Sequence, residues 1–208
     1  MKDSPLFFYF IRFCVWVWLK IWLRLESHGS KNIPAEGGVL LASNHVSYLD
    51  PPVVACGFRH RVVRFMARDT LFKGRIGGWF MRGVLCVPID RTRGDVGALR
   101  KGIQLLKSGE VMAVFPEGTR SPDGEMKEAK GGMGFLIAKA GVPVVPVYVD
   151  GTYRAMPKGS NRIKPGKVRV YYGSPIQPSE LPVAEKGRDA YHAIGAFVMD
   201  RIARLKPS

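Results

Sequence analysis

Acidic residues and cysteines are both scarce in this chain of 208 residues. Its 17 Asp and Glu stand against 32 Lys and Arg, which gives a formal net charge of +15. Such an excess of positive charge predicts an anionic partner: a nucleic acid, a negatively charged membrane surface or a phosphorylated substrate. The three cysteines (Cys14, Cys56 and Cys86) include no CxxC pair. This spacing disfavours a disulfide framework and a zinc site, and indicates free thiols in a reducing compartment.

A long apolar run without charges is also missing. A membrane-spanning helix needs roughly 18 such residues, but the most apolar segment, residues 5–26, is interrupted by Arg12, Lys20 and Arg24. On a helix with about 100° per residue these three cations share one face, and the remainder is apolar and aromatic. We therefore expect residues 1–26 to form an amphipathic helix at a membrane interface, with its cations toward the headgroups. A spanning anchor and a buried core helix remain as alternatives.

Beyond residue 26, short apolar runs alternate with helical patterns. The runs are rich in valine and are typical of strands; they cover residues 37–43, 61–67, 83–89, 110–115, 142–149 and 166–172. The clearest helical patterns cover residues 95–109, 130–141 and about 185–205. Alternation of this kind predicts an α/β fold: a single domain over residues 27–208, with a mixed, largely parallel sheet covered by helices.

The first polar stretch after a predicted strand is "SNHVSYLD", which holds His45 and Asp50. A strand that ends at Ser43 delivers His45 to the edge of the sheet where α/β proteins usually bind ligands. A spacing of five residues would rotate the pair about 140° apart on a helix, so the two side chains can meet only across a turn. Asp50 before Pro51 is equally typical of the start of a helix. A catalytic pair and plain helix capping both remain open here.

A second polar loop, "FPEGTRS", follows the predicted strand at residues 110–115. Arg120 suits a phosphate group because its planar fork donates two parallel hydrogen bonds. Glu117 can bind substrate hydroxyls or hold the arginine, and Gly118 lets the backbone approach a ligand closely. The alternative is an ordinary turn with an incidental surface ion pair.

In order along the chain, "NHVSYLD", "GVLCVPIDR", "FPEGTRS" and "VPVVPV" resemble the four sequence blocks of the glycerolipid acyltransferase family, and most of all its 1-acylglycerol-3-phosphate acyltransferase branch. The resemblance covers roughly residues 28–175. It assigns the HX4D motif to His45 and Asp50 as the catalytic pair. It also implies a set of substrate-binding residues: Arg91, Glu117, Gly118, Thr119, Arg120 and Lys130.

The resemblance implies acyl transfer from a thioester, either acyl-coenzyme A or an acyl carrier protein, to the sn-2 hydroxyl of 1-acylglycerol-3-phosphate. His45, oriented by Asp50, would act as general base without a covalent acyl-enzyme, and neither a cofactor nor a metal is expected. An anionic membrane surface on the cytoplasmic face of the cell inner membrane is the expected location. A sibling acyltransferase acting on glycerol 3-phosphate or another lysolipid, such as a lyso-ornithine lipid, is one alternative, and a non-catalytic protein that binds anionic lipid is another. Nucleic acid is disfavoured as a partner, because the basic residues carry no recognisable binding signature.

Overall fold

The computed structural model describes residues 5–74, 78–79, 81, 83, 85–89, 96–182 and 187–207. Strands in these ranges form one sheet of seven, in the order β1-β7-β6-β2-β5-β3-β4. Neighbouring strands are parallel except for β6 and β7, which are antiparallel. The strands are β1 (Glu26–His28), β2 (Val39–Ser43), β3 (Val63–Arg68), β4 (Val87–Ile89), β5 (Val111–Val114), β6 (Val144–Asp150) and β7 (Arg169–Tyr172). The prediction of a mixed, largely parallel sheet is confirmed.

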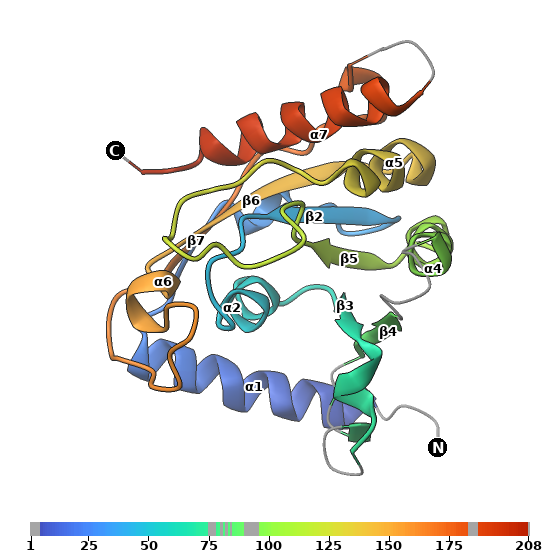
Figure 1. Cartoon of the computed structure of the whole chain (residues 1–208). Helices are drawn as coiled ribbons and strands as arrows, with labels where there is room; N and C mark the ends of the chain where they lie inside the picture. Colours follow the sequence, from blue (N-terminus) through green and yellow to red (C-terminus); the bar gives the residue numbers. More distant parts are fainter. Residues whose placement is uncertain are drawn as a thin grey trace.

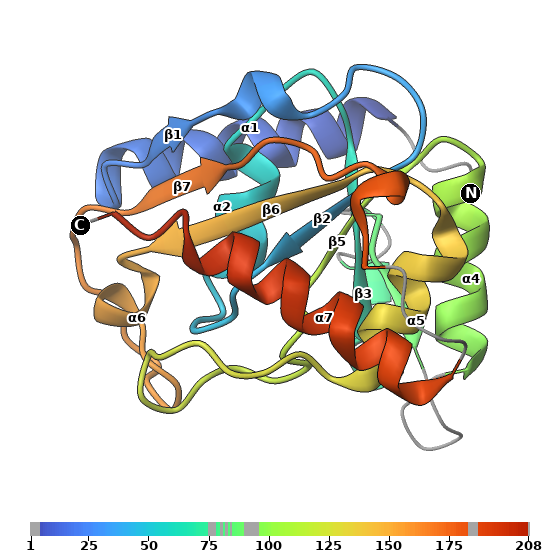
Figure 2. The same cartoon turned by 90° about the horizontal axis from the view of Figure 1, so that it is seen from above.

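Helices cover both faces of this sheet, as Figures 1 and 2 show: α5 and α7 lie over one face, α1 and α2 lie against the other, and α4 packs beside α5. The α-helices are α1 (Pro5–Trp22), α2 (Asp50–Cys56), α4 (Val96–Lys107), α5 (Gly131–Ala140), α6 (Thr152–Ala155) and α7 (Arg188–Ala203). Three short 3₁₀ turns complete the described elements: η1 (Ser30–Asn32), η2 (Asp69–Phe72) and η3 (Pro178–Glu180). The sheet is thus the middle layer of an α/β sandwich.

The central strands of the sheet are buried, which is why they coincide with the apolar runs in the sequence. Every residue of β2 and β5 is buried, and so are the first six residues of β6. Continuous apolar runs of this kind are typical of parallel strands that have helices on both faces. Because β6, β2 and β5 are adjacent and mutually parallel, the loops that follow all three emerge at the same edge of the sheet.

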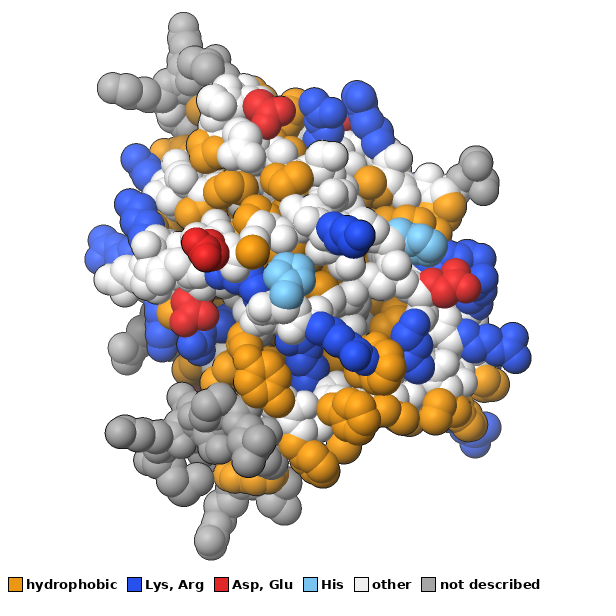
Figure 3. Space-filling model, turned by 180° about the vertical axis from the view of Figure 1, so that it is seen from behind, with side chains coloured by type: hydrophobic (Ala, Val, Ile, Leu, Met, Phe, Trp, Pro, Cys, Tyr) orange, Lys and Arg blue, Asp and Glu red, His pale blue; other side chains and the backbone are white. Residues whose placement is uncertain are grey.

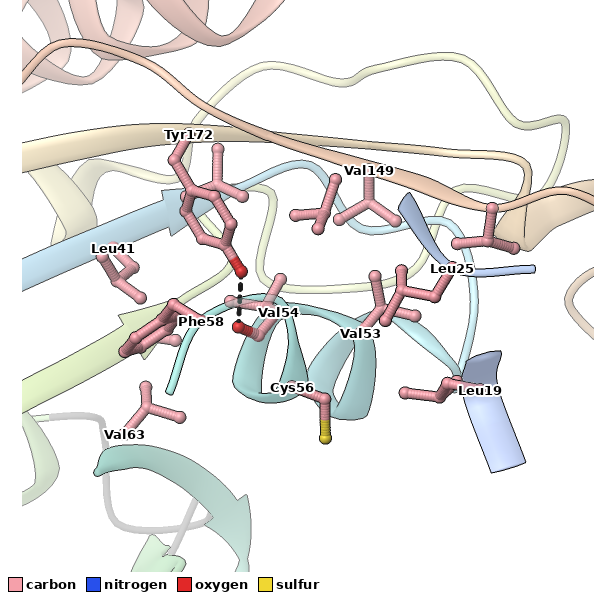
Figure 4. Close-up of a cluster of buried hydrophobic side chains, with 14 of the residues drawn as sticks. Leu19, Leu25, Leu41, Val53, Val54, Cys56, Phe58, Val63, Val149 and Tyr172 are labelled. Carbon is pink, nitrogen blue, oxygen red and sulfur yellow. Dashed lines mark hydrogen bonds between the residues drawn. The ribbon is translucent and has the colours of Figure 1, made fainter. Parts of the chain in front are cut away.

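On the α1 and α2 side, a cluster of buried apolar side chains joins the helices to the sheet (Figure 4). Tyr172 of β7 is buried within it and donates a hydrogen bond of 2.8 Å from Oη to the carbonyl oxygen of Val54 in α2 (Figure 4). Leu19, in the last turn of α1, and Leu23, directly after the helix, are fully buried in the same cluster. Burying each leucine contributes about 1.5–3 kcal/mol, so this end of α1 is part of the core.

The predicted N-terminal helix is present, but one of its cations does not point outward as the sequence suggested. Arg12 donates hydrogen bonds to the carbonyl oxygens of Phe58 and Arg61, on the loop after α2. A buried backbone carbonyl needs a donor, and the arginine supplies it to two of them. Large apolar side chains of α1 are exposed as well: Tyr9, Phe10, Phe13, Trp18, Ile21 and Trp22. No helix within the described residues is long and apolar enough to cross a bilayer.

Strand β1 was not predicted from the sequence. It has only three residues, Glu26–His28, and pairs in parallel with β7 at one edge of the sheet. Such a short segment shows no period-2 alternation that could be recognised. The boundary between an N-terminal helix and a domain beginning at residue 27 remains a prediction.

Candidate active site

Loops after β2, β5 and β6 meet at the carboxyl edge of the sheet and bring the predicted residues together. His45 and Asp50 come from the loop after β2 and from the first residue of α2. Residues 115–121 follow β5, and one backbone hydrogen bond, from Ser121 N to the His45 carbonyl, joins the two loops at 2.8 Å. Thr152 follows β6. Carboxyl ends of parallel strands are where α/β folds generally place their ligand sites.

His45 and Asp50 are in direct contact. Nδ1 of the imidazole lies 2.9 Å from Oδ2 of Asp50, and the chain between them forms the turn that their spacing required. The carboxylate is fully buried, whereas 17% of the His45 side chain remains exposed. An ionised carboxylate can only accept hydrogen bonds, so this contact places the imidazole proton on Nδ1 and leaves the lone pair on Nε2. That arrangement is typical of a general base.

Asp50 is held by more partners than the histidine alone. Its Oδ2 also accepts hydrogen bonds of 2.7 Å from the backbone N–H groups of Val46 and Ser47. Its Oδ1 accepts a 2.6 Å hydrogen bond from the hydroxyl of Thr152. Buried charges are tolerated when they are paired and hydrogen-bonded in this way. Asp50 is the first residue of α2, but Leu49 is the N-cap and no side chain caps the helix, so the capping alternative is wrong and the carboxylate instead contacts His45.

Glu117, on the loop after β5, holds the backbone of His45. One carboxylate oxygen accepts a 2.8 Å hydrogen bond from the backbone N–H of His45, and the other accepts one of 3.2 Å from Lys127. Burial raises the pKa of Glu117, although both of these backbone hydrogen bonds oppose the rise. The sequence assigned Glu117 to substrate hydroxyls or to Arg120, and that role remains a prediction, because the contacts described here are with the backbone.

The imidazole ring also rests on an aromatic side chain. Phe115, at the end of β5, stacks on His45 with ring centroids 4.0 Å apart and planes inclined by 20°. Because the ring is fixed by Phe115 on its face and by Asp50 at Nδ1, its orientation is set before a substrate binds. Such preorganisation is the usual contribution of a protein scaffold to catalysis.

Two of the predicted phosphate-binding cations lie at this edge. The guanidinium of Arg120 stacks on the ring of Tyr48, 3.4 Å from its centroid, directly within the "NHVSYLD" loop. The aliphatic part of Lys130 packs against Gly118, whose φ of 67° suits glycine, and a Cβ at that position would come within 2.8 Å of Lys130 Cδ. Gly118 therefore gives Lys130 the room to lie along the loop.

The remaining predicted residues are less informative. Thr119 is exposed, and its hydroxyl donates to the carbonyl oxygen of the neighbouring Arg120. Arg91 lies outside the described residues, so its assignment to substrate binding stays a prediction.

Three residues of this site were not singled out from the sequence: Phe115, Tyr48 and Thr152. Tyr48 lies inside the recognised motif, yet nothing in its spacing pointed to Arg120, which is 72 positions away. Thr152 comes after a glycine at the end of β6, and no motif marks it. Only the adjacency of β2, β5 and β6 brings these side chains together.

The structure shows no activated nucleophile among Cys56, Cys86 and Ser47. Burial raises the pKa of the Cys56 and Cys86 thiols to about 11, which keeps them protonated at neutral pH. The hydroxyl of Ser47 donates to the carbonyl oxygen of Met156 at 2.7 Å rather than to the histidine. Within the described ranges, no group of three or more His, Cys, Asp or Glu is placed to hold a metal ion.

Known proteins similar to this chain are acyltransferases. The chain matches the sequence profile of the Acyltransferase family over residues 24–150. The chloroplastic 1-acyl-sn-glycerol-3-phosphate acyltransferase LPAT1 of Arabidopsis thaliana is 36% identical over 165 residues, which cover 77% of this chain and 46% of the plant protein. A 1-acyl-sn-glycerol-3-phosphate acyltransferase of Bacillus subtilis (strain 168) is 28% identical over 176 residues, which cover 81% of this chain and 85% of that protein. The chain thus spans about half the length of the plant relative.

A solved structure also matches. The crystal structure of PlsC, the 1-acyl-sn-glycerophosphate (LPA) acyltransferase from Thermotoga maritima, aligns with a TM-score of 0.75 at 30% sequence identity, and the match covers 100% of this chain and 86% of that one. The profile covers more than half of the sequence and includes the His45–Asp50 pair and residues 117–120. This chain belongs to the Acyltransferase family.

Proposed function

We propose that this protein transfers a fatty acyl group from a thioester to the sn-2 hydroxyl of 1-acylglycerol-3-phosphate, giving phosphatidate. The observation that carries this function is the contact between His45 Nδ1 and Asp50 Oδ2, next to a loop that carries Arg120. The names of the plant, bacterial and Thermotoga relatives support the choice of acceptor.

In the proposed reaction, Nε2 of His45 takes the proton from the sn-2 hydroxyl as its oxygen attacks the thioester carbonyl carbon. The carbon–sulfur bond breaks in the collapse of the tetrahedral intermediate, and the imidazolium returns its proton to the departing thiolate. General-base assistance of this type contributes about 10²–10⁴ in rate. Asp50 supports it by keeping the proton on Nδ1 and stabilising the imidazolium that forms. The protonated thiols described above favour this direct transfer over a covalent acyl-enzyme.

The phosphate of the acceptor would be held by Arg120 and Lys130, with Arg91 as a further candidate. Arg120 is held from one side by the Tyr48 ring, which leaves the N–H groups at the edge of its guanidinium available for phosphate oxygens. Fixing the phosphate places the sn-2 hydroxyl beside His45, and such positioning can supply a large share of the rate.

The donor and the location belong to the same proposal. Acyl-coenzyme A and an acyl carrier protein are both anionic, and the net charge of +15 suits either of them. We place the protein on the cytoplasmic face of the inner membrane, with the exposed aromatic face of α1 in the interface. Aromatic side chains are common at that depth of a bilayer.

The experiment is an acyl-transfer assay in mixed micelles with each donor and a panel of acceptors: 1-acylglycerol-3-phosphate, glycerol 3-phosphate, a lysophospholipid with a substituted phosphate and a lyso-ornithine lipid. We expect phosphatidate from the first acceptor at a kcat/KM at least about tenfold above that of the two acceptors without a phosphate monoester, since a free phosphate engages both cations. Glycerol 3-phosphate carries the same phosphate but no acyl chain, so its turnover tests whether that chain is needed. A preference for another acceptor would move the assignment to a sibling reaction. No turnover with any acceptor, despite lipid binding, would favour a non-catalytic lipid-binding protein.

A further inference from the structure

Two adjoining cavities lie between α1 and the loop after α2, away from His45. The larger has a volume of about 280 Å³ and is lined by residues that include Trp16, Lys20, Ser30 and Arg59. The smaller, of about 160 Å³, shares Trp16 and Arg59 and continues to Phe13. Both cavities lie beyond the C-terminal end of α2, whereas Asp50 begins that helix. The seven residues of α2 therefore separate the cavities from Asp50 by about 10 Å.

The described linings of these cavities carry positive charge and no acidic residue. Lys20 and Arg59 line the larger one and Arg12 the smaller, and none of the described lining residues is Asp or Glu. Burial is the main reason that the pKa of Arg12 is lowered, and the charge of Arg59 lowers it further. Like charges this close, with no acid in the lining, favour an anion in the space they share.

The two cations at the larger cavity keep donors available. The guanidinium carbon of Arg59 lies over the ring of Trp16, 3.7 Å from its centroid, so the ring holds the group from one side while the N–H groups along its edge stay open to a ligand. Lys20 donates one hydrogen bond of 2.6 Å to the Leu25 carbonyl oxygen, and an ammonium group has three N–H donors in total. Ser30 adds a hydroxyl to the same lining.

Next to this charged pocket lies the exposed apolar face of α1. Phe10, Phe13 and Ile21 are each more than half exposed. Figure 3 shows this side of the molecule: basic side chains lie directly beside hydrophobic ones along the lower edge, where α1 runs. Cations bordering an apolar surface match the layering of a bilayer, where phosphates lie just outside the acyl chains.

We propose that the pocket between Trp16, Lys20 and Arg59 binds the phosphate headgroup of an anionic glycerophospholipid that is not a substrate, and so fixes α1 on the membrane. The larger cavity is slightly below the size of most small-molecule sites, about 300 Å³ and upward, which suits a headgroup whose acyl chains stay in the bilayer. This site rests on the membrane location proposed above and is independent of the acyl-transfer reaction.

The test compares two double variants that lose the same charge. Lys20→Gln/Arg59→Gln removes the pocket's cations, and Lys101→Gln/Lys139→Gln removes exposed cations from α4 and α5. Affinity is measured for vesicles of phosphatidylcholine alone and of phosphatidylcholine mixed with phosphatidylglycerol. The pocket variant should bind the anionic vesicles about tenfold to thirtyfold more weakly than the wild type. The matched control should change by less than about twofold, because its charges lie on the other side of the sheet and are screened.

The proposed site would be overturned if the two double variants lost vesicle affinity equally. It would also be overturned if the wild type bound vesicles with and without phosphatidylglycerol equally well. A second arm identifies the source of the phosphate: water-soluble dihexanoyl phosphatidylglycerol should raise the Tm of the wild type but not of the pocket variant. Inorganic phosphate at the same concentration should not do so, and an equal rise would show a free-anion site instead of a lipid site.

Acyl transfer in detergent micelles separates the two proposals. The pocket variant should keep wild-type turnover there, since Lys20 and Arg59 lie away from His45. A loss of micellar turnover at an unchanged Tm would show that these cations serve the reaction and would overturn an independent site. Charge-specific vesicle binding in a wild type that transfers no acyl group would leave the headgroup site standing and refute the proposed reaction.

Discussion

Thr152 Oγ1 lies 2.6 Å from Asp50 Oδ1, and both residues are fully buried. This contact joins the start of α6, after β6, to the start of α2, after β2. Thr152 lies just beyond the matched family range, which ends at residue 150, whereas Asp50 lies within it. With Thr152 on one carboxylate oxygen and His45 on the other, the three side chains form a continuous hydrogen-bonded chain through Asp50. Thr152 is thus a positioning residue that acts through Asp50.

Replacing Thr152 by valine keeps the shape of the side chain and removes this donor. We expect Thr152→Val to lower the free energy of unfolding by about 1–3 kcal/mol, because a buried carboxylate oxygen loses its partner. We also expect kcat to fall about tenfold at an unchanged KM for the acceptor, which corresponds to about 1.4 kcal/mol in the transition state. Steady-state kinetics and urea denaturation measure the two effects. Thr152→Ser, which keeps the hydroxyl, should restore kcat; failure to do so would show that packing of the methyl group is what matters.

Tyr48 holds Arg120 by a cation–π contact at the exposed edge of the site. An exposed contact of this kind is worth about 0.5–1 kcal/mol. We therefore expect Tyr48→Leu to raise the KM for 1-acylglycerol-3-phosphate about threefold to fivefold with little change in kcat. Tyr48→Phe keeps the ring face and should behave like the wild type. If the leucine variant lowered kcat at constant KM, Tyr48 would act on the chemical step and not on the phosphate.

The raised pKa of Glu117 predicts how the free energy of unfolding changes with pH. Its pKa is raised in the folded protein above the reference value of 4.5, mainly by burial. The folded state therefore binds this proton more tightly than the unfolded state, and the contribution of Glu117 to stability falls as pH rises above 4.5 toward the folded pKa.

The check is urea denaturation of the wild type and of Glu117→Gln over that pH range. Glutamine does not titrate, so the free energy of unfolding of the wild type minus that of the variant should decrease as pH rises. A difference that grew with pH would mean that the hydrogen bonds from the His45 and Lys127 backbone outweigh the cost of burial.

The exposed face of α1 can be tested without removing the helix. Deleting residues 1–26 would also remove Leu19 and Leu23 from the core, and would therefore unfold part of the protein. We expect Phe10→Ser/Phe13→Ser/Ile21→Ser to weaken vesicle binding about tenfold or more, since each of these side chains is exposed and apolar. A vesicle-flotation assay measures this binding, with the Tm as a control for folding. Unchanged binding would exclude this face from the interface.

The fold was predictable to a large extent because β2, β5 and β6 are buried on both faces. Burial on both faces requires continuous apolar runs, and these are visible in the sequence without any alternation. The three-residue β1 could not be found in the same way, because its pairing depends on β7, more than 140 positions later.

The site was predictable where a single loop carries the residues, as with His45 and Asp50, and less so where the contacts cross between loops. The backbone contact of Glu117 with His45 and the hydroxyl of Thr152 on Asp50 depend on strand order, which no local pattern encodes. The inward turn of Arg12 was missed for a related reason. Helical spacing places three cations on one face but does not say that the carbonyl oxygens of Phe58 and Arg61 lie opposite that face.

The central claim is that Asp50 orients His45 as the general base for acyl transfer. The measurement that tests it most directly is single-turnover acyl transfer to 1-acylglycerol-3-phosphate by the wild type, His45→Ala and Asp50→Asn, with the Tm of each variant recorded. We predict that His45→Ala lowers the rate by about 10²–10⁴ at a nearly unchanged Tm, and that Asp50→Asn causes a comparable loss by allowing the wrong tautomer. A His45→Ala variant that transfers the acyl group at the wild-type rate would contradict the account.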